Sequence, residues 1–111
     1  MTADTEFPLP DPMRIRAAMN GARTVVKILM AHDMETGQRR NAAGETIPAW
    51  FIQTVAVTTN GRTVLSAQWG PAVARNPYLQ FQFAGAQPGD RIQVTWVDNR
   101  GASRTDEATV T

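Results

Sequence analysis

His32 is the only histidine of the chain, and two carboxylates, Asp33 and Glu35, follow it closely. An imidazole beside carboxylates can act as a general base or bind a metal ion. A catalytic site needs several groups that converge on one point, and a single histidine in an acidic loop is ordinarily solvated or hydrogen-bonded. We therefore interpret His32 as a non-catalytic residue.

Other catalytic patterns are missing from the sequence. The chain has no cysteine, which excludes disulfides, thiol catalysis and zinc–thiolate sites within it. Ser66 and Ser103 lack the glycine-flanked turn of a serine nucleophile, and no glycine-rich phosphate loop precedes a helix pattern. Gln38, Arg39 and Arg40 form a short basic cluster, which is either a solvated loop tip or a patch that faces an anion or a partner. This inventory favours binding over catalysis.

Length and composition indicate one globular domain. The chain has 111 residues, a net charge of +1, no basic stripe for nucleic acid and no run of roughly 18 apolar residues that would span a membrane. Residues 1–12 are acidic, contain three prolines and lack the basic and apolar regions of a secretory signal. We expect a flexible arm over 1–12 and one domain over 13–111, without contacts to nucleic acid or membrane.

Seven short segments alternate apolar and polar residues with the period of a half-buried strand. Asn20-Gly21 and Asn60-Gly61 are strong hairpin signals, and no segment has a convincing helical period. The expected strands are 13–19, 24–30, 50–59, 63–69, 78–83, 92–96 and 103–111. Seven short strands with regular turns predict an all-β, immunoglobulin-like β-sandwich of about seven strands.

Aromatic side chains can supply the core that the missing disulfide does not. Large rings bury much apolar area, and the candidates are Trp50, Phe51, Trp69, Phe81, Phe83 and Trp96. The charged run 104–107 breaks the apolar alternation of the last segment. It indicates either an edge strand protected by charge or an edge that pairs with another chain. The polar segment 31–48, longer than an ordinary hairpin loop, is the first place to look for function.

Several stretches together resemble the SoxZ family, the small subunit of the SoxYZ sulfur carrier of thiosulfate oxidation. They occur in family order and cover nearly everything from residue 13 onward: 13–16, 32–37, 47–49, 51–53, 67–71, 76–78, 95–98 and 105–108. Two positions depart from the family pattern, which often has proline at Asp33 and histidine at Trp50. The second departure removes an imidazole near the loop and weakens any essential role for histidines.

The resemblance implies an immunoglobulin-like sandwich that forms a heterodimer with SoxY in the periplasm. SoxY carries the sulfur intermediates on a cysteine in a mobile C-terminal arm and presents them to the other Sox enzymes. This chain would then be non-catalytic and need no cofactor or metal. We expect the loop 31–49 and one sheet edge to contact the partner, and the candidate interface residues are His32, Met34, Glu35, Arg39, Arg40 and Trp50.

Two alternatives stay open at this point. A metal-dependent redox enzyme on a related sandwich would need several histidine or cysteine ligands, and the chain has one histidine. A free-standing binding module would use exposed aromatic rings as a platform, but buried rings more often serve packing.

Overall fold

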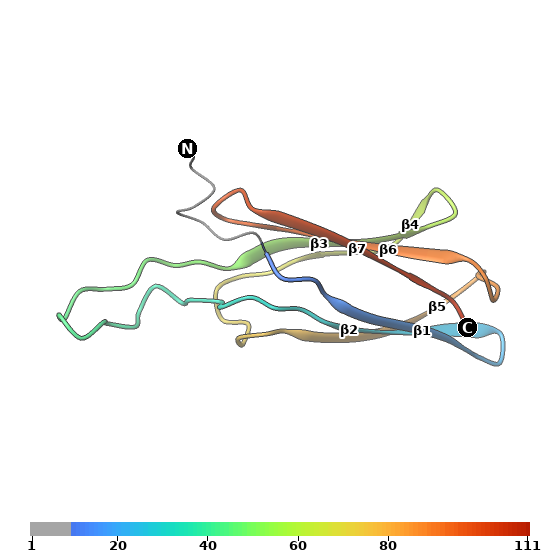
Figure 1. The fold of residues 1–111 in the computed structure, drawn as a ribbon, viewed down its shortest axis with the longest axis horizontal. Helices are drawn as coiled ribbons and strands as arrows, with labels where there is room; N and C mark the ends of the chain where they lie inside the picture. The colour runs from blue at the N-terminus through green and yellow to red at the C-terminus, as the bar shows by residue number, and fades with distance from the viewer. Residues whose placement is uncertain (1–9) are drawn as a thin grey trace.

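In residues 10–111, seven β-strands form two antiparallel sheets that pack face to face (Figure 1). The computed structural model describes residues 10–111. The strands are β1 (Arg14–Asn20), β2 (Arg23–Leu29), β3 (Ile52–Thr59), β4 (Arg62–Gln68), β5 (Tyr78–Ala84), β6 (Arg91–Asp98) and β7 (Ser103–Thr109). The predicted all-β, immunoglobulin-like sandwich is confirmed. Of the predicted arm over 1–12, residues 1–9 lie outside the described part of the chain.

The strand order shows where the chain changes sheets. One sheet has the order β1-β2-β5 and the other β4-β3-β6-β7. The chain crosses between sheets after β2, β4 and β5, whereas β1/β2, β3/β4 and β6/β7 are hairpins. No helix in residues 10–111 is long and apolar enough to cross a membrane.

The two Asn-Gly signals mark hairpins of different turn types. In β3/β4 the loop is Asn60-Gly61 and both residues have positive φ, as a type I′ turn requires. In β1/β2 the register pairs Asn20 with Arg23, so the loop is Gly21-Ala22 and only Gly21 has positive φ. That is the pattern of a type II′ turn, whose first central residue is glycine. Both turns match the twist of the strands that they join.

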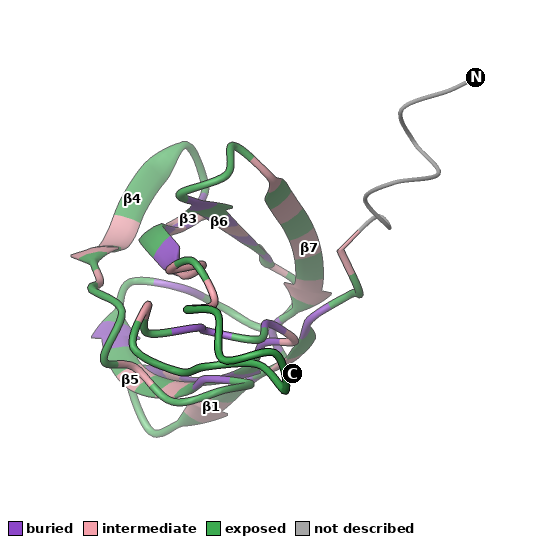
Figure 2. Cartoon of the chain, turned by 90° about the vertical axis from the view of Figure 1, so that its left-hand side faces the viewer, coloured by how far each residue is buried: buried purple, intermediate pink, exposed green. Residues whose placement is uncertain are grey.

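The inward positions of both sheets form one apolar core. Trp96 is the largest fully buried side chain, and Trp69 packs against the core from a partly buried position. More buried and more exposed residues alternate along most strands, as the banding of β7 shows (Figure 2), which is the pattern of strands with one face toward a core. The fully buried aliphatic residues are Val26, Ile28, Met30, Ile52, Val55, Val57, Ile92, Val94 and Val110.

β7 is an edge strand, and two charged residues of its run 104–107 face the sandwich interior. Arg104 and Asp106 lie opposite Trp96 and Val94 in the β6–β7 register, so they share the inward face of the sheet. The Arg104 guanidinium donates two hydrogen bonds to the Asp106 carboxylate, which also accepts one from the Met13 backbone N–H. Inward charges of this kind discourage edge-to-edge association.

Residues 30–51, called the extension from here on, project well beyond both sheets (Figure 1). Two isolated bridges, Glu35 to Trp50 and Arg40 to Thr46, pair the outgoing and returning halves. At the tip the Asn41 side-chain oxygen accepts hydrogen bonds from two backbone N–H groups. The predicted long loop is therefore a narrow hairpin-like ribbon with its own hydrogen-bond ladder.

Candidate functional site

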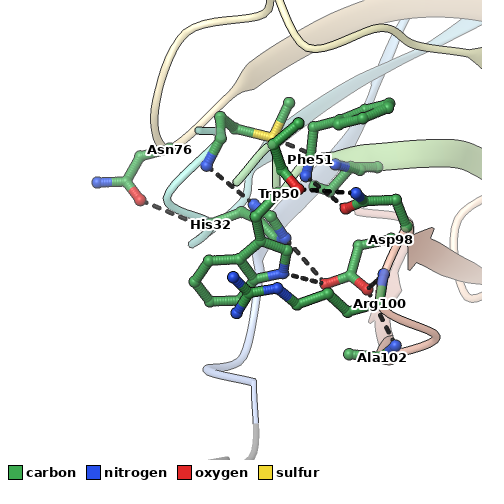
Figure 3. Close-up of polar contacts among 11 residues, drawn as sticks. His32, Trp50, Phe51, Asn76, Asp98, Arg100 and Ala102 are labelled. Carbon is green, nitrogen blue, oxygen red and sulfur yellow. Dashed lines mark hydrogen bonds and ion pairs between the residues drawn. The ribbon is translucent and has the colours of Figure 1, made fainter. Parts of the chain in front are cut away.

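The Asp98 carboxylate lies at the base of the extension and accepts four hydrogen bonds (Figure 3). Oδ2 accepts from His32 Nε2 at 3.0 Å and from Trp50 Nε1 at 2.8 Å. Oδ1 accepts from the backbone N–H groups of Arg100 and Ala102, both at 2.9 Å. This single side chain therefore joins the two halves of the extension to the end of β6.

The hydrogen bonds of His32 determine its tautomer. Its Nδ1 accepts a hydrogen bond from the Met34 backbone N–H at 3.0 Å, so Nδ1 carries a lone pair. The proton is then on Nε2, which donates to Asp98. Both ring nitrogens are occupied and the side chain is only 2% exposed, so no nitrogen is free to accept a proton from a substrate.

Opposing effects act on the pKa of Asp98. Burial, the largest effect, raises the pKa because it disfavours the charged form. The hydrogen bonds from His32, Trp50 and the two backbone N–H groups stabilise the carboxylate and together outweigh burial. The pKa of Asp98 is therefore lowered from its ordinary value, and the group is an anion at neutral pH.

Aromatic rings enclose the His32–Asp98 pair. The His32 ring lies 4.8 Å from the Trp50 ring and makes a T-shaped contact at 5.2 Å with Trp96. The Arg100 guanidinium covers the outer side of Trp50 at 4.2 Å, a cation–π distance. The Trp96 indole N–H has no hydrogen-bond partner in residues 10–111, so Trp96 contributes apolar packing beneath His32. The rings keep water away from the pair and strengthen its hydrogen bonds.

The segment 32–37 has a backbone path that depends on side chains. Met34 has a φ of 52°, a left-handed conformation that is rare for a bulky residue. Its N–H bonds the His32 ring, its side chain is buried, and its sulfur accepts a weak hydrogen bond from the Ile52 N–H. Gly37 also has a positive φ, and a Cβ there would lie 3.1 Å from the Ala49 Cβ. The left-handed path and the close approach together explain the glycine.

Two asparagines clamp the base of the extension from neighbouring loops. Asn76 exchanges backbone and side-chain hydrogen bonds with His32 on the outgoing half. Asn99 exchanges backbone and side-chain hydrogen bonds with Phe51 and donates one to the Ala49 carbonyl on the returning half. Because both halves are held at several points, the extension leaves the sandwich in one direction.

The side chains of His32, Asp33 and Glu35, which the sequence analysis weighed as a general base or metal site, do not converge on one point. Asp33 is exposed, and Glu35 forms a bidentate ion pair with Arg39 that lowers the pKa of Glu35. The acidic partner of His32 is instead Asp98, the last residue of β6, which the sequence analysis did not single out as a site residue. The prediction that His32 is a hydrogen-bonded side chain is confirmed, and the structure shows that this side chain is buried and not solvated.

The other candidate residues differ in accessibility. Met34 is buried, Trp50 is half-buried, and Arg39 and Arg40 are exposed. Arg40 donates a hydrogen bond to the Gly44 carbonyl near the tip. Residues 10–111 contain no group of three or more His, Cys, Asp or Glu side chains that could hold a metal ion. The arrangement can therefore fix the shape of the extension, and it offers no assembled catalytic group.

Asp98→Asn is expected to lower the free energy of unfolding by about 2–5 kcal/mol, measured by urea denaturation. An amide has one acceptor oxygen, so its NH2 group would face two N–H donors of the site and leave them unsatisfied. Asp33→Asn is the matched control, because Asp33 is exposed, and it should change stability by less than about 0.5 kcal/mol. Equal effects of the two variants would contradict this role for Asp98.

Stability should also fall in acid because the folded-state pKa of Asp98 is lowered. The unfolded chain then binds more protons, so the contribution is complete above the unfolded pKa of about 3.9 and is lost as pH falls through the folded pKa. Urea unfolding at a series of pH values below about 5 should show a smaller acid loss in Asp98→Asn than in wild type. Identical pH slopes would refute the linkage.

Comparison with solved structures identifies relatives of the fold. A hypothetical protein of Pyrococcus horikoshii has a TM-score of 0.60 and 12% identity, over 92% of this chain and 89% of its own. Superoxide reductase (neelaredoxin) from Ignicoccus hospitalis has a TM-score of 0.54 and 13% identity, over 99% and 88%. A variant of superoxide reductase (neelaredoxin) from Archaeoglobus fulgidus, in the reduced form, has a TM-score of 0.54 and 16% identity, over 100% and 95%. At these identities the likeness shows a shared sandwich.

Sequence comparison is more specific. No curated protein matches the chain. Residues 13–109, however, match the family described as sulphur oxidation protein SoxZ, and this match includes all seven strands and the complete extension. The chain therefore belongs to the SoxZ family.

Proposed function

We propose that this chain is the non-catalytic subunit of a heterodimeric sulfur carrier, in which SoxY holds the sulfur intermediates covalently on its cysteine. SoxZ family membership implies a role in Sox sulfur oxidation, which is periplasmic, and a SoxY partner. The observation that carries the finer proposal is the absence of cysteine from all 111 residues of a family member. A chain without a thiol needs a partner to hold the sulfur.

The absence of cysteine also suits the neighbour of a sulfur carrier. A persulfide or thiosulfonate on a carrier cysteine is open to attack by another thiolate, as in thiol–disulfide exchange. A thiol-free subunit cannot capture the cargo in this way. His32 adds no competing chemistry, because both of its ring nitrogens are engaged by Met34 and Asp98.

The extension is the recognition element in this proposal. Its base is held by the hydrogen bonds of Asp98, Asn76 and Asn99, which pre-organise the ribbon and lower the entropy lost on binding. Arg39 and Arg40 would contact the partner directly from exposed positions, and Trp50 would contribute from the half-buried base. His32, Met34 and Glu35 would act by holding the ribbon in shape.

Co-expression with SoxY tests the proposed function. The two chains should co-purify as a heterodimer, and after loading with thiosulfate and the Sox enzymes the added mass should appear on SoxY alone in intact mass spectrometry. SoxY with its arm cysteine replaced by serine is the control and should still co-purify without an adduct. Failure to associate with SoxY, or a sulfur adduct on this chain, would overturn the proposal.

Arg40→Glu tests the extension as a recognition element. We expect the affinity for SoxY to fall by about three- to tenfold, measured by calorimetry, because a charge at an interface rim is worth a modest free energy. Arg91→Glu makes the same change in net charge at the start of β6, at the opposite end of that strand from the base of the extension. This control variant should leave the affinity for SoxY unchanged. Equal affinities of wild type and Arg40→Glu would show that the ribbon tip does not contact SoxY.

A further inference from the structure

In the part of the chain that the structure describes, four strands lie at sheet edges: β1 and β5 in one sheet, β4 and β7 in the other. The C-terminal residue Thr111 forms backbone hydrogen bonds with Ala17 and Met19 of β1, and Met13 bonds Asp106 of β7. The edges of β1 and β7 are therefore joined to each other at two points. Within residues 10–111, β4 and β5 share one such contact, from the Arg62 side chain of β4 to the Ala84 carbonyl at the end of β5, and the rest of both edges has none.

The pairing of β5 shows which of its backbone groups face outward. The Met30 N–H bonds the Pro77 carbonyl, and antiparallel hydrogen-bonded pairs recur at every second residue. Leu79, Phe81 and Phe83 therefore exchange hydrogen bonds with β2. The N–H and C=O groups of residues 78, 80 and 82 point to the free edge, where no group of residues 10–111 hydrogen-bonds them. The Ala84 carbonyl is covered, because Arg62 donates to it.

The edge of β5 lacks the features that usually prevent strand addition. Natural edges are protected by charges, proline, bulges or inward-pointing charged residues. β7 has the inward pair Arg104 and Asp106, and β4 pairs with β3 through a bulge after Val57. β5, Tyr-Leu-Gln-Phe-Gln-Phe-Ala, has no charge, proline or glycine and pairs in unbroken register with β2. The edge of β5 is therefore better suited to pair with an added strand than the edge of β4 or β7.

The outer face of the same sheet is cationic. In the registers of β1, β2 and β5 the outward positions include four basic residues and no acidic one: Arg14, Arg16, Arg23 and Lys27. Arg16, Lys27 and Gln80 lie in one row across the sheet. The next row contains Leu29 and Tyr78, which are 41% and 58% exposed. The outer face of the other sheet has its basic residue Arg91 paired with Glu107.

The free edge of β5 is continuous with the extension. The Pro77 carbonyl accepts a hydrogen bond from the N–H of Met30, where the extension begins. Asn76 exchanges hydrogen bonds with His32. Tyr78, the first residue of β5, therefore follows directly after the clamp at the base of the extension. A partner that contacts the extension can reach the edge of β5 without a gap.

We propose that the free edge of β5, together with the cationic outer face of its sheet, binds an extended strand of SoxY that bears acidic side chains. This inference rests on the proposed function, which supplies the partner. The outward backbone groups of residues 78–82 pair with the added strand, and the row of Arg16 and Lys27 selects acidic side chains beside it. The three-stranded sheet then becomes part of a sheet shared by two chains.

Residue-level amide hydrogen exchange tests the strand addition directly. In the full chain, labelled with 15N and examined by NMR, the amides of Gln80 and Gln82 should exchange quickly. In the complex with full-length SoxY their exchange should slow by on the order of 100-fold, since backbone pairing protects amides. Ser66 and Gln68 on the free edge of β4 are the matched control and should not change.

Two substitutions extend the test to affinity. Gln80→Pro removes an outward N–H, which an edge strand tolerates, and Lys27→Glu reverses one charge on the cationic face. Each should weaken SoxY binding by on the order of tenfold. Ser66→Pro and Arg91→Glu, the corresponding changes on the other sheet, should not. If Gln80→Pro prevents folding, the amide exchange of the unmutated chain still tests the strand addition, and the affinity of Lys27→Glu still tests the cationic face.

The outcomes separate the two proposals. Association with SoxY without protection at Gln80 and Gln82 would overturn the β5 site and leave the proposed function standing. Protection at Gln80 and Gln82 with unchanged affinity of Lys27→Glu would overturn the role of the cationic face. Absence of any complex would overturn both proposals.

Discussion

The buried carboxylate of Asp98 is the interaction on which the rest of the site depends. Burying a charge costs free energy unless the charge is hydrogen-bonded. Two side-chain donors and two backbone donors offset the cost of burying the Asp98 carboxylate. Its donors come from both halves of the extension and from the β6–β7 turn. One desolvated anion therefore determines the tautomer of His32, the position of Trp50 and the direction of the ribbon.

The His32–Asp98 pair holds the shape of the extension, and its hydrogen bonds leave no ring nitrogen of His32 open to a substrate. In an enzyme, a histidine beside a carboxylate commonly leaves one nitrogen for the substrate. Here the Met34 N–H takes that nitrogen and the aromatic rings exclude water, so the same pair of groups serves as a structural tie. This arrangement suits a subunit that positions a partner's reactive group, and it agrees with a chain that has no cysteine.

The edge strands differ in how well they are protected against pairing with another strand, and this difference follows from the sequence of each strand. β7 places Arg104 and Asp106 inward, where they pair with each other and Asp106 also accepts a hydrogen bond from the N–H of Met13, just before β1. β5 alternates apolar and neutral polar residues without any charge, which is the pattern of a strand with neighbours on both sides. The proposed strand addition would cover this edge.

Much of the fold could be read from local pattern. Alternation located all seven strands, and Asn60-Gly61 indicated its turn correctly, because side-chain period and turn chemistry act over a few residues. The Asn20-Gly21 signal found the hairpin, but the register moved the loop by one residue to Gly21-Ala22. The long connection was found, but its pairing was not, because isolated bridges such as Glu35 to Trp50 have no local signature.

The sequence by itself determined the class of fold, the family resemblance and the absence of thiol chemistry, since all three depend on residue types and their order. The tertiary structure alone decided that His32 bonds Asp98, 66 positions away, instead of its acidic neighbours. It also decided that Met34 adopts a left-handed conformation and that no other strand of residues 10–111 pairs with the outer edge of β5. These features arise from contacts between distant segments, whose energies come from burial and geometry that no local pattern contains.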